Sequence, residues 1–149
     1  MLGFLTLYGK PKGRARELNI NTHGRISERL VGKPIEVQGG TRAIVELTAT
    51  EEMAADSTGL THGGFTFGLA DYAAMLAVNH PNVVLGSAQA KFTAPVKTGD
   101  TMKAEATITK IDGKKSEVNI DVKVGEQKVF TGTFLCYSLE KHVLEKSQT

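Results

Sequence analysis

The residue best placed to do chemistry in this sequence is Asp71, which lies alone among apolar and small residues over positions 59–79. An isolated carboxylate in such a setting is costly unless it is paired, hydrogen-bonded or protonated. The stretch contains no Lys or Arg, and burial without a cation raises the pKa of a carboxyl group toward the range useful for proton transfer. Asp71 is therefore either a functional acid or base, or a structural acid bonded to neighbouring backbone.

A second candidate site precedes Asp71 in the sequence THGG, where His62 is followed by Gly63 and Gly64. The apolar stretch predicts a helix from His62 to Asn79, so both glycines fall in its first turn, where backbone N–H groups lack intrahelical partners. Glycine lets a ligand approach these groups closely, and the partial positive charge of a helix start stabilises a carbonyl oxygen as it becomes an oxyanion. The alternative is a plain helix start that needs glycine for packing.

The spacing of these two candidates favours a site shared between subunits. Gly63 and Asp71 are eight residues apart, which is about 12 Å along one helix. Within one chain they cannot both touch one reacting bond. Two antiparallel helices packed across a twofold axis would bring Gly63 of one subunit to Asp71 of the other, so the spacing suggests a dimer.

The rest of the chain reads mainly as strands, because apolar and polar residues alternate in a manner typical of sheets with one dry face. Strands are predicted over residues 42–49, 83–96, 102–109, 116–124 and 127–139. The last of these is apolar on both faces and is expected in the middle of the sheet. Turns at Asp112-Gly113 and Gly125-Glu126 predict antiparallel neighbours. One long helix and a sheet that must bury its dry face predict a single α+β domain.

The two ends of the chain are predicted to lie outside this domain, which is placed at residues 25–140. Residues 1–24 are expected to form a flexible, solvated arm rather than a phosphate-contacting segment. Residues 141–149 are expected to form a tail. The basic residues of the arm alternate among Gly and Pro, at Lys10, Lys12, Arg14 and Arg16.

Composition argues against several classes of function. The net charge is only +2 and the basic residues are scattered, so no nucleic-acid-binding face is indicated. The single cysteine, Cys136, rules out an internal disulfide and is expected to be a buried small residue. The four histidines show no spacing typical of a metal site, and no phosphate-loop, dinucleotide or serine-hydrolase motif occurs. Without a membrane span or secretory signal, a cytoplasmic protein that needs no cofactor is expected.

Two segments, HGGFTFGLADYAAMLAVN at residues 62–79 and AKFTAPVKTGD at residues 90–100, resemble the hotdog-fold acyl-CoA thioesterases of the phenylacetate-degradation (PaaI) type. That group carries HGG, an acid nine positions after the His, and a strand that ends in a Pro-containing turn with Gly-Asp. The resemblance spans roughly residues 25–140. It implies a hotdog domain, in which a curled antiparallel sheet of five to six strands wraps a long central helix. It also implies active sites between the subunits of a homodimer or homotetramer.

The resemblance further implies roles for individual residues. Gly63 would polarise the thioester carbonyl through its N–H, and Asp71 of the partner subunit would act as general base or nucleophile. His62 would shape the oxyanion site or position the substrate. Asp56 stands six residues before His62, where the family usually has Asn. It could be a working acid, a loop residue or a sign of altered activity.

Two functions from different classes follow. The first is hydrolysis of a small or medium acyl- or aryl-CoA thioester to the free acid and CoA. The second is a hotdog module that binds acyl-CoA as a ligand sensor without cleaving it. Asp71 favours the enzyme, because a binder gains nothing from a buried base, and no helix-turn-helix is recognisable in the first 40 residues. Further candidates for contact with the substrate are Gly64, Ser87, Phe65 and Tyr72. Aromatic residues at the spacing of Phe65 and Tyr72 are more often plain core.

Overall fold

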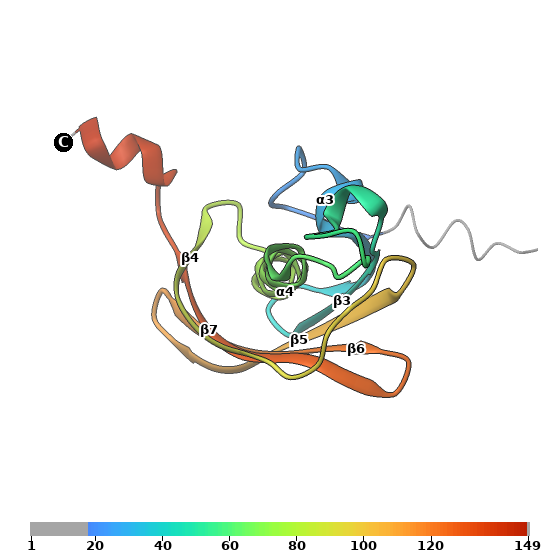
Figure 1. Ribbon diagram of the computed structural model, residues 1–149. Coiled ribbons are helices and arrows are strands. Elements are labelled where there is room, and N and C mark those ends of the chain that lie inside the picture. The colour runs from blue at the N-terminus through green and yellow to red at the C-terminus, as the bar shows by residue number, and fades with distance from the viewer. Residues whose placement is uncertain (1–17, 149) are drawn as a thin grey trace, which may run out of the picture.

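The computed structural model describes residues 18–148, which form one long helix, α4, enclosed by a curled six-stranded antiparallel sheet (Figure 1). The short helix α3 (Glu28–Val31) and the first described residues lie on the side of α4 away from the sheet. This arrangement confirms the predicted α+β hotdog architecture. The predicted arm residues Lys10, Lys12, Arg14 and Arg16 lie outside the described part of the chain.

Helix α4 (Gly63–Val78) is the core of the molecule. It begins after His62 and ends at Asn79, whose backbone is left-handed (φ 58°). Every residue from 72 to 77 is buried, because the helix is apolar nearly all round and the sheet wraps it. The helix prediction is therefore confirmed to within one residue at each end.

The sheet has the strand order β2-β3-β5-β6-β7-β4, and all neighbouring pairs are antiparallel. Its strands are β2 (Lys33–Gln38), β3 (Arg42–Thr48), β4 (Val83–Phe92), β5 (Thr101–Asp112), β6 (Lys115–Val124) and β7 (Gln127–Ser138). Sequence reasoning missed β2, a short edge strand that contains Pro34. Proline is tolerated at an edge, where its missing N–H removes no ladder bond, but it hides the strand from pattern analysis.

The predicted alternation places apolar side chains against α4. In β6, Val118, Ile120 and Val122 are buried while Asn119 and Lys123 are exposed. Strand β7 lies between β6 and β4, which confirms its predicted internal position. Strand β4 forms the opposite edge to β2, and residues 86–92 of it are exposed along their whole length.

Of the two predicted hairpin turns, one is confirmed and the other is displaced by one residue. Gly125-Glu126 joins β6 to β7 as expected, with Gly125 at φ 60°. The other prediction, Asp112-Gly113, is wrong by one residue. Asp112 still pairs with Lys115 in the ladder, so the connecting residues are Gly113 and Lys114. Gly113 (φ 61°) takes the first turn position because glycine adopts that left-handed conformation without strain.

Two kinds of feature are absent from residues 18–148. None of the helices there is both long and apolar enough to cross a membrane. No three His, Cys, Asp or Glu side chains come together in a way that could hold a metal ion. At the end of the chain, a 3-10 helix (Val143–Gln148) projects away from the body of the domain (Figure 1).

The C-terminal end of α4 is tied to the segment before α3 through Asn79. Its side-chain Nδ2 donates a hydrogen bond to the carbonyl of Asn19 (2.7 Å), and its Oδ1 accepts one from the N–H of Asn21 (2.9 Å). Asn79 itself is buried, with 8% exposure. Asn19 and Asn21, which fall within the predicted flexible arm, are thus hydrogen-bonded to the end of α4.

Substitution of Asn79 tests this link. Asn79→Gly keeps the left-handed backbone but removes both hydrogen bonds, so the free energy of unfolding should fall by about 1–3 kcal/mol. Asn79→Ala should lose about 1 kcal/mol more because a Cβ disfavours positive φ. Urea denaturation followed by circular dichroism measures both changes. An Asn79→Gly midpoint equal to that of the wild type would contradict the structural role of these bonds.

Candidate functional site

Asp71 lies half-buried in the middle of α4. Its Oδ1 is enclosed and has no hydrogen-bond partner in the described part of the protein. Burial raises the pKa of Asp71 from its ordinary value of 3.8 to about 6. The structural alternative, a carboxylate held by neighbouring backbone, therefore finds no support at this oxygen, and a carboxyl group with this pKa changes its protonation state just below neutral pH.

The charge of Asp71 affects the pKa of one residue of the sheet, Cys136 of β7. Cys136 is fully buried, as predicted. Burial first, and the negative charge of Asp71 second, raise the pKa of its thiol to about 12. A thiol with this pKa stays protonated at neutral pH and is a poor nucleophile. Cys136 is therefore neutral and adds no second negative charge beside the Asp71 carboxylate.

The start of α4 is fixed by two loops. The N–H of His62 donates to the carbonyl of Met53 (2.8 Å), and the N–H of Thr61 donates to the carbonyl of Val96 (2.8 Å). His62 is the N-cap residue but makes no side-chain capping bond. The first N–H groups of the helix, those of Gly63 and Gly64, therefore have neither an intrahelical carbonyl nor a capping oxygen as partner.

Side chains also pack closely against both glycines. A Cβ atom at Gly64 would lie 3.0 Å from Cδ2 of His62, so the imidazole folds back against the first helical turn. Phe65 lies beside the same ring, with 6.3 Å between the ring centroids. Four of the predicted site residues thus lie together at one helix start, namely His62, Gly63, Gly64 and Phe65, and the packing of the glycines does not exclude the oxyanion role.

Sequence reasoning missed Phe92 at this place. Phe92 is the last residue of β4, and its ring carbon Cε1 would lie 3.2 Å from a Cβ at Gly63. The ring packs edge-on against Phe130 (5.1 Å between centroids), yet Phe92 remains 56% exposed. The available signal was an aromatic residue at the end of a strand, within the segment AKFTAPVKTGD that carried the family resemblance.

The most open side of α4 carries Gly64, Gly68 and Asp71. These residues are spaced by four and three positions and so share one helix face. Gly64 is exposed and the other two are half-buried, and no atom lies within 4 Å of a Cβ placed at Gly68. A second surface can therefore approach the backbone of α4 closely beside Asp71.

Asp56 does not join Asp71 within one protomer. It is exposed, and its Oδ1 accepts hydrogen bonds from the N–H (2.9 Å) and the hydroxyl (2.6 Å) of Thr58. These bonds lower the pKa of Asp56, whereas burial alone accounts for the raised pKa of Asp71. The geometry is that of a carboxylate that stabilises its own turn.

The remaining candidates lie apart from the helix start. Tyr72 is buried in the core with 5% exposure, and its ring lies 6.2 Å from that of His23. Ser87 is exposed on β4, next to an irregularity in the pairing of β4 with β7 at Leu85 and Ser87. Within one protomer, no hydrogen bond or ring contact among residues 18–148 joins Ser87 or Tyr72 to His62 or Gly63.

Known proteins resemble this chain in sequence and in fold. A family model described as the thioesterase superfamily matches residues 58–131. Among solved structures, an uncharacterized protein from Pyrococcus horikoshii is 56% identical, with a TM-score of 0.83, over 85% of this chain and 96% of that one. An Asn-to-Asp mutant of the phenylacetic acid degradation protein PaaI from Thermus thermophilus is 26% identical, with a TM-score of 0.69, over 75% of this chain and 96% of that one.

Two curated relatives are longer than the part that matches. A methylthioribose-1-phosphate isomerase from Aquifex aeolicus is 49% identical over 78% of this chain, but the match spans only 25% of that protein. A transcription factor FapR from Caldanaerobacter subterraneus is 31% identical over 81% of this chain and 60% of the factor. Each name describes a protein of which this chain matches a part, so neither name transfers an activity to it.

The buried carboxylate predicts a stability change with pH. Because the pKa of Asp71 is raised on folding, its neutral form is favoured, and the associated stability is fully present below pH 4 and lost as the pH rises through about 6. Asp71→Asn should therefore raise the free energy of unfolding at pH 7.5 by about 2–3 kcal/mol and give no gain near pH 3.5. Urea denaturation at both pH values measures the difference.

Asp56→Asn serves as the matched control, because the pKa of Asp56 is shifted in the opposite direction. Its carboxylate contributes stability above its unfolded pKa and loses it as the pH falls. The control should show no gain at pH 7.5. Equal stability of Asp71→Asn and wild type at pH 7.5 would mean that Asp71 finds a partner in solution that the protomer lacks.

Proposed function

Because the chain belongs to the thioesterase superfamily, we propose that it hydrolyses a small or medium acyl- or aryl-CoA thioester to the free acid and CoA. The observation that carries this proposal is Asp71, an enclosed carboxyl group with no partner at Oδ1 and a pKa of about 6. A carboxylate that is only lightly solvated and titrates just below neutral pH is suited to take a proton from water. The PaaI likeness supports thioesters as the substrate class.

The proposed reaction uses the N–H groups at the start of α4 on one side of the thioester and Asp71 of the partner subunit on the other. The thioester carbonyl oxygen accepts hydrogen bonds from the N–H groups of Gly63 and Gly64, which stabilise the charge that develops on it. Asp71 of the partner subunit removes a proton from water as the water oxygen bonds to the carbonyl carbon. The carbon–sulfur bond then breaks and the CoA thiolate leaves, taking up a proton. In an alternative order, Asp71 attacks as nucleophile and water hydrolyses the resulting anhydride.

A homodimer is needed to assemble this site. Gly63 and Asp71 lie on one helix and are separated by about 12 Å, so one protomer cannot present both to one bond. The open face with Gly64 and Gly68 allows the helix start of a second copy to reach Asp71. The uncovered edge of β4 supports the same pairing, because an exposed edge strand presents unpaired backbone groups to another chain.

The aromatic residues around Gly63 define where the acyl group lies. Phe92 covers one side of Gly63 with its exposed ring, and Phe65 and His62 cover the turn that follows. A carbonyl bound at Gly63 has its substituents against the Phe92 ring, so an apolar or aromatic acyl group gains contact there. In this proposal Asp56 stabilises its own turn and takes no part in the reaction. Ser87, which is exposed on β4, contacts an outer part of the substrate.

A second function is favoured by one observation. The FapR transcription factors match this chain over more than half of their length, so a related domain occurs in regulatory proteins. The alternative is therefore a module that binds acyl-CoA without cleaving it. The two functions differ in what Asp71 does after binding.

Thiol release from a panel of short-chain, medium-chain and aryl acyl-CoAs tests the proposal. The wild type should release CoA from at least one of them, with a rate that rises with pH through about 6 as Asp71 loses its proton. Asp71→Asn should lower kcat by about 10²- to 10⁴-fold. Asp112→Asn, which changes an exposed carboxylate at the end of β5, should leave kcat unchanged.

The same panel distinguishes the hydrolase from a module that binds acyl-CoA without cleaving it. If neither wild type nor Asp71→Asn releases CoA while both bind an acyl-CoA with equal affinity in calorimetry, the protein is a binding module. If the wild type binds no acyl-CoA at all, both functions are rejected.

Gly68→Leu tests the shared site. The protomer has no atom within 4 Å of this position, so the folded protomer should persist, as seen by circular dichroism. The new side chain should block close approach to α4 and abolish both dimer formation and thiol release. Gly24→Leu, at a loop glycine with equally open surroundings, is the matched control. A dimeric, fully active Gly68→Leu protein would show that the open face of α4 is not the interface.

A further inference from the structure

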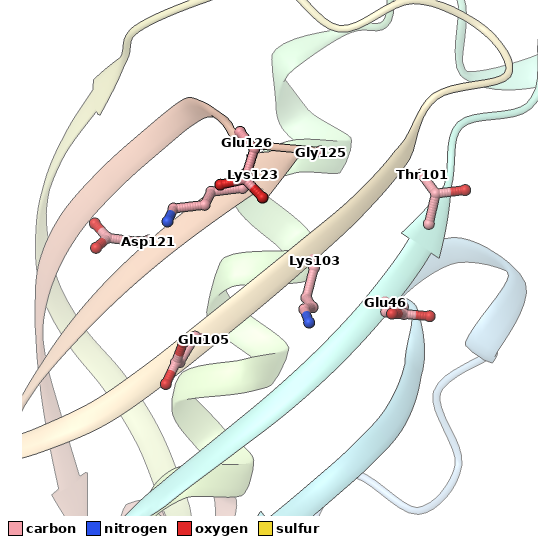
Figure 2. A pocket seen from close by; sticks show the side chains of 8 residues that line it. All are labelled: Glu46, Thr101, Lys103, Glu105, Asp121, Lys123, Gly125 and Glu126. Carbon is pink, nitrogen blue, oxygen red and sulfur yellow. The ribbon is translucent and has the colours of Figure 1, made fainter.

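Two of the hollows on the surface of residues 18–148 differ in the charges that line them. The larger one, of about 500 Å³, lies over β5 and β6, where four carboxyl groups line it together with Lys103 and Lys123 (Figure 2). The smaller one, of about 270 Å³, is lined by no Asp, Glu, Lys or Arg among these residues. An anion would meet four carboxylates in the larger hollow, whereas no charge of the lining opposes it in the smaller one.

The smaller hollow lies beyond the C-terminal end of α4, between three segments that are far apart in the sequence. One segment precedes α3, one runs from the end of α4 into β4, and one follows β7. Half of the lining residues are apolar and half can form hydrogen bonds. The apolar ones are Pro81, Val83, Val84 and Val143, and the polar ones are Thr22, His23, Asn82 and His142. A ligand that matches this lining has an apolar body and a polar head.

His23 is held at this hollow by its backbone and by its neighbours. Its φ of 58° makes it one of two non-glycine residues with positive φ in residues 18–148, the other being Asn79, which ends α4. Side chains rarely adopt this conformation, and residues that do are found often at functional sites. The Nδ1 of His23 shares a hydrogen bond with the hydroxyl of Thr22 (2.8 Å), and its ring lies 6.2 Å from that of Tyr72. Its other ring nitrogen, Nε2, forms no hydrogen bond within the described chain and is left for a ligand.

His142 presents a hydrogen-bond donor to the same hollow. Its Nδ1 accepts a hydrogen bond from the N–H of Leu144 (3.0 Å), so the proton of a neutral His142 ring lies on Nε2. Asn82 holds the segment that leads to His142, because its Nδ2 donates to the carbonyl of Leu139 (3.2 Å). The hollow therefore combines an N–H donor of fixed tautomer with the Nε2 of His23.

An anion matches this pair of imidazoles better than a metal ion does. Within residues 18–148, no three His, Cys, Asp or Glu side chains come together in a way that could hold a metal, and metal centres need three or four protein ligands. Partial burial lowers the pKa of His23 because it disfavours the imidazolium, and an adjacent negative charge favours that form again. No carboxylate of the lining supplies this charge, so a bound anion can supply it.

We propose that this hollow binds a small organic carboxylate with an apolar body. The carboxylate oxygens accept hydrogen bonds from Nε2 of His142 and of His23, and the hydrocarbon part lies against Val83 and Val84. The hydroxyl of Thr22 then donates to Nδ1 of His23, which leaves the ring proton on Nε2. A volume of about 270 Å³ is just below the range of about 300–1,000 Å³ typical of pockets for drug-sized ligands, so the ligand is a short-chain or aryl acid.

The hollow is separate from the site of the proposed hydrolysis. Asp71 lies about 12 Å before the end of α4 at Asn79, and the lining residues from α4 to β4 follow that end. An acid bound in the hollow therefore does not occupy the place of the reacting thioester. A free acid is one of the two products of the proposed hydrolysis, so the hollow has the chemistry to bind product. Only this last step rests on the proposed function, and the binding site itself does not.

The imidazole resonances in NMR spectra test the site, because the chain has only four histidines, His23, His62, His80 and His142. The probes are butyrate and phenylacetate, with an expected Kd of about 0.1–1 mM. Either acid should shift the resonances of His23 and His142 at lower concentrations than that of His62. Inorganic phosphate, an anion without an apolar body, should bind about tenfold more weakly than phenylacetate.

Two substitutions remove the donors with little change to the fold. His23→Asn keeps a residue type that tolerates positive φ, and His142→Ala removes an exposed ring. Each should weaken the binding of phenylacetate about tenfold or more, the loss expected for one hydrogen bond to a charged group, and the remaining histidine of the hollow reports it. His62→Gln changes a histidine at the other end of α4 and, as the matched control, should bind phenylacetate like the wild type. Circular dichroism and urea denaturation check that all three variants are folded.

Three results would overturn the proposal. The first is no shift of the His23 and His142 resonances with either acid up to about 10 mM. The second is tighter binding of inorganic phosphate than of phenylacetate, because the apolar residues of the lining then contribute nothing. The third is loss of binding in His62→Gln but not in His23→Asn, which would place the acid at the helix start. Asp71→Asn should bind phenylacetate like the wild type, so failure of this site and failure of the proposed hydrolysis are distinguishable.

Discussion

Enclosure of α4 is the constraint on which the rest of the structure depends. A helix that is apolar on nearly every side cannot lie on the surface of a sheet, because half of its circumference would then face water. The sheet curls until its inner face, from β3 to β4, contacts the helix. What remains open is the narrow face with Gly64, Gly68 and Asp71. The same burial that stabilises the domain also desolvates the one carboxyl group of the helix, so stability and the raised pKa have a common cause.

The elements of the fold were readable because their patterns follow directly from this burial. The alternation in β5 and β6 determines which side chains face α4 and which face solvent, and the uniformly apolar helix has to be buried on nearly every side. Strand β2 escaped because an edge strand with Pro34 is buried along part of its length and shows no clear period. The turn after β5 was displaced by one residue because Asp112 and Gly113 are both good turn residues, and only the ladder decides which of them still pairs.

The site was readable in part. Asp71 and Gly63 stood out because a lone acid and a glycine pair are rare in an apolar helix, and the structure places Asp71 half-buried in α4 and Gly63 in its first turn. For Tyr72 the sequence left open both a substrate contact and plain core, and the structure places this side chain in the core with 5% exposure. Phe92 could not be placed from sequence, because its contact with Gly63 joins the end of β4 to the start of α4. Long-range contacts of this kind depend on the curvature of the sheet, which no local pattern encodes.

Similarity of fold and identity of function are separate matters for this chain. The isomerase and the FapR factors contain segments similar to this chain within longer proteins, and a shared fold does not by itself imply a shared function. Function is decided by the groups of the site rather than by the fold that carries them.

The strand order also has a consequence for how the chain reaches this state. Strands β5, β6 and β7 are joined by short turns and can pair as soon as they leave the ribosome, whereas β4 pairs with β7, the last strand to be made. Until then, α4 can already pack against β3, β5 and β6, but β4 has no neighbouring strand to pair with. Completion of the sheet therefore has to wait for β7, as expected for sheets that contain distant pairings. The nascent chain carries β4 as an unpaired strand for that interval, and unpaired strand edges favour aggregation and chaperone binding.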